Sequence, residues 1–120
     1  MRILRGFGII LLVLSAFAVA KDSTLGIHDV SRVRFETAVH IGSSVLPAGQ
    51  YVVRHTMEGQ EHVMVFKRDG SKEEYKAKCS LVSLDKKAPR DQVTYQVSGN
   101  EKVVQEMVFQ GDTAKHVFGN

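Results

Sequence analysis

The sequence predicts an all-β protein, either an antiparallel β-sandwich or a small, partly closed β-barrel of about seven strands. Three observations lead to this fold class. Apolar and polar residues alternate over much of the chain beyond residue 30, which is the period of a half-buried strand. Short segments containing glycine or proline interrupt the alternation at the spacing common in sandwiches and barrels. No segment sustains a helical period.

Residues 1–20 are expected to be a signal peptide. Arg2 and Arg5 give a basic start, an apolar stretch follows, and Ala18 and Ala20 supply the small residues of a cleavage site. The apolar stretch from residue 6 to residue 20 has 15 residues, and a membrane-spanning helix needs about 20. We therefore expect cleavage after Ala20, export to the periplasm or the cell exterior, and a single β-domain over residues 21–120 without a transmembrane anchor.

The composition argues against a nucleic-acid-binding protein. Once Arg2 and Arg5 are removed, 14 of the 16 Lys and Arg residues remain against 13 Asp and Glu, a net charge of +1. No run of basic residues of the kind that marks nucleic-acid binding occurs. Cys79 is the only cysteine, so no internal disulfide can form and the fold must be held by packing. We expect Cys79 to be a small buried apolar residue in a strand.

The first predicted strand spans residues 32–41, with alternate residues on one face: Val33, Phe35, Thr37, Val39 and Ile41. The segment Leu46-Pro47-Ala48-Gly49 then predicts a type I turn from Leu46, closed by Gly49 in the left-handed region. Strands over 50–57 and 62–68 follow, joined by a turn at 58–61. Asp69 and Gly70 form a dipeptide that favours a two-residue hairpin.

The second half continues with a strand over 71–84 and a polar loop at 85–91. Strands over 92–97, 103–110 and 114–118 complete the set. Between the first two of these, a two-residue loop at Gly99 and Asn100 would place Val97 opposite Lys102. Pairing Val97 with Val103, and Val93 with Met107, matches apolar faces better, and a slip of one residue inverts every side chain. The sequence therefore predicts a five-residue loop over 98–102.

Part of the sequence resembles a group of small uncharacterised exported bacterial β-proteins that carry an L-P-A-G-x-Y motif. The matching residues are Phe35, Val39, Gly42, Leu46, Pro47, Ala48, Gly49, Tyr51 and Val53. The segment 93–111 is similar to a second block of that group, two strands around a glycine turn. The chain lacks the proline and the second aromatic residue that are frequent near Phe35 in that group, and its C-terminus differs. The resemblance implies an exported β-fold and brings no catalytic residue.

The most specific candidate site is a group of histidine, methionine and cysteine side chains. If the turn at 58–61 pairs Met57 with His62, then His55, Met57, His62 and Met64 share one face. A two-residue hairpin at 69–70 would place Cys79 diagonally from His62. Imidazole, thiolate and thioether groups are ligands that copper accepts, although methionine in a strand is more often core filler. We assign no metal ligand and no cofactor from the sequence, and retain His55, Met57, His62 and Cys79 as candidates for copper.

A second candidate is an internal cavity for a small apolar ligand, as a small barrel could enclose. Six residues would line it: Tyr51, Phe66, Tyr75, Tyr95, Met107 and Phe109. The alternative, which we favour, is that these side chains fill the core of a sandwich of this size. In the same way, the exposed lysines and arginine at 72–90 are expected to be a solvated surface that protects an edge. That basic surface could also contact an acidic partner or a membrane.

The sequence favours a protein without catalytic activity. Glu73 and Glu74 are neighbours in a predicted strand and so point to opposite faces, and His116 has no partner visible in the sequence. None of the short motifs that mark hydrolases, zinc proteases or phosphate-binding loops is present. We expect a structural or binding module of the cell envelope, with a protein partner or a small apolar ligand. The alternative is a carrier of such a ligand in a barrel cavity, and a more remote one is a copper-binding protein.

Overall fold

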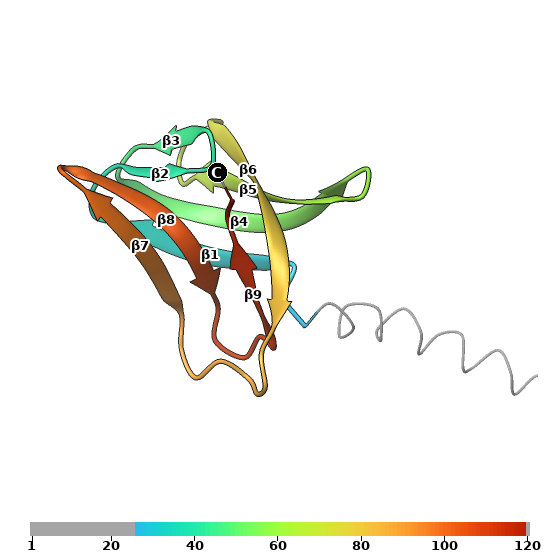
Figure 1. The fold of residues 1–120 in the computed structure, drawn as a ribbon. Coiled ribbons are helices and arrows are strands. Elements are labelled where there is room, and N and C mark those ends of the chain that lie inside the picture. Colours follow the sequence, from blue (N-terminus) through green and yellow to red (C-terminus); the bar gives the residue numbers. More distant parts are fainter. Residues whose placement is uncertain (1–25, 120) are drawn as a thin grey trace, which may run out of the picture.

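Nine strands and no helix make up residues 26–119, the part of the chain that the computed structural model describes (Figure 1). The all-β prediction is confirmed, with two strands more than expected; the predicted signal peptide lies outside the described residues. None of the described residues forms a helix that could cross a membrane. The strands are β1 (Val30–Phe35), β2 (Val39–Ile41), β3 (Ser44–Leu46), β4 (Gly49–Glu58), β5 (Glu61–Arg68), β6 (Glu74–Ser83), β7 (Gln92–Ser98), β8 (Glu101–Val108) and β9 (Ala114–Val117).

One strand, β6, belongs to both layers of the fold. Its first part, up to Cys79, pairs with β5, and its second part, from Ser80, pairs with β9. The first layer therefore runs β1-β4-β5-β6, and the second continues through β9 to β8, which also pairs with β7 and β2. Figure 1 shows β6 passing from one layer to the other. The described strands do not close into a barrel, because β1, β3 and β7 each pair with a single neighbour.

The strand predicted over residues 32–41 is divided into two. Residues 36–38 leave the strand conformation, and Thr37, predicted to face inward, is exposed. The break lets β1 pair with β4 in the first layer while β2 joins β8 in the second. The contact of His40 with Val103 is parallel, whereas the other pairings among the described strands are antiparallel. The sheet is therefore mixed, where the sequence predicted a wholly antiparallel one.

The Leu46–Gly49 corner is held from inside by side chains. Gly49 has a φ of 150°, a positive value that favours glycine but lies beyond the left-handed helical region that was predicted. The Tyr51 hydroxyl donates a hydrogen bond to the Pro47 carbonyl over 2.6 Å. Arg68 donates from Nη2 to the Ala48 carbonyl over 3.1 Å. The tyrosine of the L-P-A-G-x-Y motif thus fixes the backbone that precedes it.

Replacing Tyr51 with phenylalanine should lower the free energy of unfolding by about 1 kcal/mol, because the partly buried Pro47 carbonyl loses its donor. Urea denaturation followed by circular dichroism measures this change. The matched control is Tyr75→Phe, which removes a hydroxyl from a half-buried ring next to Tyr51 and should cost less than about 0.5 kcal/mol. Equal costs for the two substitutions would mean that the hydroxyl does not secure the corner.

Two hairpins in the first layer set the register of the candidate site. Gly59 and Gln60 form a two-residue turn, so Met57 pairs with His62 as predicted. The two-residue hairpin predicted at Asp69 and Gly70 is wrong. That dipeptide lies in a four-residue loop over 69–72, where the Ser71 amide donates to the Arg68 carbonyl over 3.2 Å. The observed pairing of β5 with β6 differs from the predicted one by two residues. Every side chain therefore keeps its face, and Cys79 lies directly opposite His62.

The β7–β8 hairpin departs from prediction at one end and agrees with it at the other. Its loop has two residues, so Val97 pairs with Lys102 and the predicted five-residue loop is wrong. A β-bulge at Gln105 then shifts the register by one, so Val93 pairs with Met107 as predicted. Val97 is 65% exposed and needs no apolar partner. The bulge lets one hairpin combine a tight turn with an apolar inner face.

The inner faces of the two layers form one packed core. Residues of both layers are fully buried in it, among them Phe35, Ile41, Leu46, Tyr51, Phe66 and Met107. The six residues considered as a cavity lining belong to this core or pack against it: Tyr51, Phe66, Met107 and Phe109 are buried members, and Tyr75 and Tyr95 are partly buried. These side chains contact the core cluster and fill the space between the layers.

Candidate functional site

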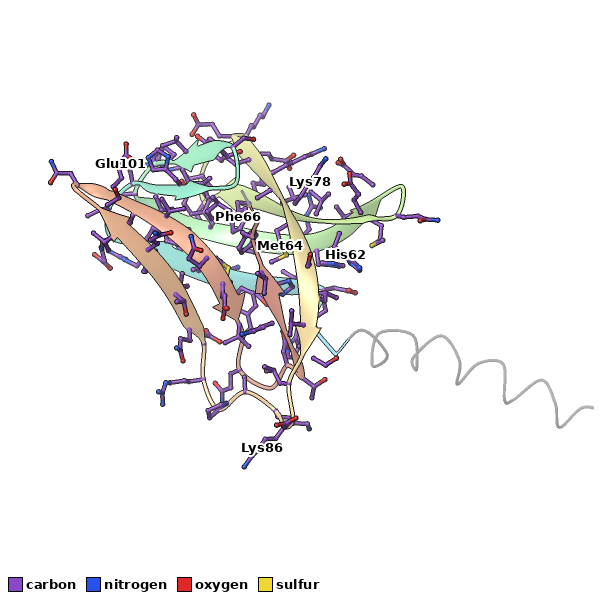
Figure 2. The ribbon with its side chains drawn as sticks, viewed as in Figure 1. His62, Met64, Phe66, Lys78, Lys86 and Glu101 are labelled. Carbon is purple, nitrogen blue, oxygen red and sulfur yellow. The ribbon has the colours of Figure 1, made fainter. Side chains whose placement is uncertain are left out.

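Three histidines and one cysteine come together near the point where β6 passes between the layers. They lie on four strands: His55 on β4, His62 on β5, Cys79 on β6 and His116 on β9. The register accounts for their proximity. His62 pairs with Cys79, and the flanking strands β4 and β9 place His55 and His116 on the same inner face. Figure 2 labels His62 and Met64, which lie on β5 two residues apart. We refer to these four residues as the His/Cys cluster.

Two short contacts are linked by a third in the His/Cys cluster. His55 Nε2 lies 3.0 Å from His62 Nδ1, and the centres of these rings are 5.0 Å apart. Cys79 Sγ lies 3.8 Å from His116 Nδ1. The rings of His55 and His116 connect the two pairs, with their centres 5.9 Å apart. The four side chains thus form a continuous chain of contacts across both layers.

The cluster runs from the surface into the core. His55 and His62 are half-buried, whereas His116 is 2% exposed and Cys79 is 9% exposed. Phe109 packs edge-on against the His116 ring, with 5.9 Å between ring centres. Met64 is buried, while Met57 is 46% exposed. A solvent-borne species would therefore meet His55 and His62 first.

Burial keeps the inner pair uncharged near neutral pH. It raises the pKa of the Cys79 thiol to about 11. Burial also lowers the pKa of His116 to about 4, with a further contribution from the nearby His55 and His62. The pKa of His55 is lowered by burial and by His62. A reactive cysteine–histidine pair needs a thiolate beside an imidazolium, and both shifts here are in the opposite direction.

The sequence candidates are only partly brought together. His55, His62 and Cys79 meet, whereas Met57 is at the exposed end of the hairpin. His116 was missed, because nothing near it in the sequence indicates a partner. Its signal was the two-residue period, which places it on the same face as the buried Ala114 and Phe118. Within residues 26–119, no three His, Cys, Asp or Glu side chains already stand in an arrangement that could hold a metal ion.

A separate cleft of about 670 Å³ lies beneath the loop that follows β6. Backbone hydrogen bonds of 2.9 Å join Ala88 in this loop to Asp112 and Gly111. Lys86 projects from the tip of the loop in Figure 2. The cleft has an apolar part formed by Leu84, Ala88, Pro89, Met107 and Val108, and a polar part formed by Asp85, Lys86, Lys87, Gln92, Thr94, Glu106 and Lys115. We refer to it as the 84–92 cleft.

A buried carboxylate fastens the start of the described chain to the β8–β9 loop. Asp112 is 2% exposed, and its Oδ1 accepts hydrogen bonds from the His28 amide and from His28 Nδ1. Burial raises the pKa of Asp112, and the contact with His28 opposes that rise. The Thr113 amide donates to the Gly26 carbonyl over 2.7 Å at the same place. The pair holds these two segments together and was not expected from the sequence.

No protein-family model, curated protein or solved structure matches the chain.

Proposed function

We propose that the chain is an exported, non-catalytic binding module of the cell envelope that holds a small apolar ligand with a negative charge in the 84–92 cleft. The observation that carries this proposal is the cleft itself. Its volume of about 670 Å³ falls in the range of about 300–1,000 Å³ that small-molecule sites occupy. Most of the cleft's lining surface is also apolar, as is typical of such sites, while five of its lining residues are charged.

The packed core is the reason for placing the ligand outside the sandwich. Tyr51, Phe66 and Met107 have no exposed surface and occupy the space that a barrel carrier would leave for its ligand. A ligand site between the layers would require these side chains to move apart. The 84–92 cleft requires no such movement, because it already opens to solvent beside the loop.

The charge at the cleft favours an anionic group on the ligand. Lys115 is paired with Glu106, with 2.9 Å between Nζ and Oε1. Lys86 and Lys87 are exposed on the loop at the rim, where Asp85 is the neighbouring acidic residue. A carboxylate or sulfonate at the rim would lie near both lysines while an alkyl or aromatic body covered Leu84 and Val108.

The absence of catalysis is supported by the state of the buried cysteine. A nucleophilic thiol is normally a thiolate in an electropositive, partly exposed place. Burial instead raises the pKa of Cys79 to about 11. His116, its neighbour, is kept neutral by a pKa of about 4. These two groups are suited to a stable, uncharged contact.

Titration of the mature protein with a dansyl-labelled fatty acid tests the proposed ligand class. We expect saturable binding with increased dansyl emission, and an affinity that falls about tenfold in the double variant Lys86→Glu, Lys87→Glu. The matched control is Lys67→Glu, Lys72→Glu, which makes the same change of charge at exposed residues that do not line the cleft. No saturable binding, or equal losses in the two double variants, would refute the proposal.

A further inference from the structure

We propose that His55, His62, His116 and Cys79 form a site for one thiophilic transition-metal ion, of the kind represented by Zn(II) and Cu(I), at the junction of the two layers. This inference goes beyond the ligand cleft and is independent of it, because the two sites share no residue. Imidazole nitrogen and thiolate sulfur are both ligands that zinc takes, and four of them complete a tetrahedral site. Thiolate and imidazole ligands also suit copper.

The spacing of the rings is close to what a shared ion requires. Metal–nitrogen bonds of about 2.0–2.1 Å place two imidazole ring centres about 5 Å apart around a tetrahedral ion. The observed separations are 5.0 Å for His55 and His62 and 5.9 Å for His55 and His116. Two of the three ring pairs, both involving His55, therefore already lie at about the distances found around one ion.

The ligand atoms are spaced in the same way. Two nitrogens on one tetrahedral ion are about 3.3 Å apart, and a nitrogen and a sulfur are about 3.6 Å apart. In the structure His55 Nε2 and His62 Nδ1 are 3.0 Å apart, and Cys79 Sγ and His116 Nδ1 are 3.8 Å apart. Each pair could chelate an ion with displacements of a few tenths of an ångström.

The remaining requirement is to aim both pairs at one point. No three of these groups already hold that arrangement among the described residues. The torsion that turns an imidazole about its Cβ–Cγ bond is broad, so the rings can turn without a change in the backbone. His55 and His62 are half-buried and can turn most easily. An ion would replace the His55–His62 and Cys79–His116 contacts with four metal–ligand bonds.

A bound cation would offset the cost of a buried thiolate. Burial opposes a lone thiolate at Cys79, and a metal ion supplies the compensating positive charge. On binding, the S–H proton is released to solvent and the sulfur forms a bond to the metal. The ligands come from β4, β5, β6 and β9, so strands of both layers hold them at fixed positions, which is the arrangement that gives precise sites.

The test uses untagged mature protein, stripped of metal under reducing conditions and titrated separately with Zn(II), Co(II) and Cu(I). We expect one ion per chain after dialysis, measured by elemental analysis, and a cobalt–thiolate absorption band with Co(II). His62→Ala should lower the affinity at least about tenfold. The matched control is His40→Ala, a half-buried histidine on β2 outside the cluster, which should leave the affinity unchanged.

Cys79→Ser gives an independent spectroscopic readout. If its circular dichroism shows the native β-fold, we expect Co(II) binding without the thiolate band. Tight binding of Zn(II) alone or of Cu(I) alone would support the site and identify its ion. Failure of folded wild-type protein to bind either ion stoichiometrically would refute the inference. Equal losses in His62→Ala and His40→Ala, or a thiolate band that persists without Cys79, would refute it as well.

Discussion

Replacing Phe66 with alanine should lower the free energy of unfolding by about 3–5 kcal/mol. Phe66 is fully buried on β5, and its ring meets that of Phe118, with 6.5 Å between the ring centres. It therefore joins the first layer to the segment that follows β9 in the second. Truncation to alanine removes the apolar contact and leaves a cavity between two layers whose strands prevent complete collapse.

Urea denaturation monitored by circular dichroism provides the measurement for Phe66→Ala. The control is Val97→Ala, since Val97 is 65% exposed and its loss should change stability by no more than about 0.5 kcal/mol. A cost below about 1 kcal/mol for Phe66→Ala would contradict the conclusion that side chains fill the space between the layers. It would also reopen the possibility of a ligand cavity there.

Acidification of the metal-free protein should remove about 3 kcal/mol of stability between pH 6.5 and pH 4 through His116. Burial, with His55 and His62 nearby, lowers the pKa of this residue from 6.5 to about 4. Because the pKa in the folded state is the lower one, the unfolded chain binds the proton more readily. The stability that neutral His116 contributes is fully present above pH 6.5 and is lost as the pH falls from there through 4.

The variant His116→Leu isolates this effect. We expect its stability to depend less steeply on pH than that of the wild type between pH 6.5 and pH 4, with a small residual slope because the pKa of His55 is also lowered. The groups that face His116 are His55, Phe109 and Cys79, and His62 acts on it from β5. Chemical denaturation at several pH values with a chelator present checks the result. Parallel pH profiles for the two proteins would show that His116 is not the responsible group.

The sequence predicted which side chains face the core better than it predicted which residues pair across neighbouring strands. A two-residue period is a local property, so it correctly placed Phe35, Tyr51 and Met107 in the core. Register depends on loops, and two local rules failed there. Asp69 and Gly70 formed a turn inside a longer loop, and the bulge at Gln105 reconciled a tight turn with an apolar face. The longer loop leaves the alternation unchanged, whereas the bulge interrupts it, because Val104 and Met107 are both buried although they are three residues apart.

The candidate site was predicted in part for the same reason. His55, His62 and Met57 were correctly placed on one face because a two-residue turn joins their strands. His116 lies 37 residues from Cys79 along the chain, and only the order of strands brings them together. The position of β9 between β6 and β8 depends on packing across the whole domain. The 84–92 cleft depends in addition on how a polar loop folds back, and the two-residue alternation of the sequence gives no information about that.

The central place of β9 bears on the order of events during synthesis. Ala114–Val117 pairs with β6 on one side and β8 on the other, so among the described strands β9 connects β8 and its neighbours to β6. The pairing of β9 with β6 joins residues such as Ser80 and Val117 that are far apart in the sequence, and such contacts form slowly because a large loop must close. A polypeptide still emerging from the ribosome would lack this strand and remain open, which suits a protein that, as we propose, is threaded through a membrane before it folds.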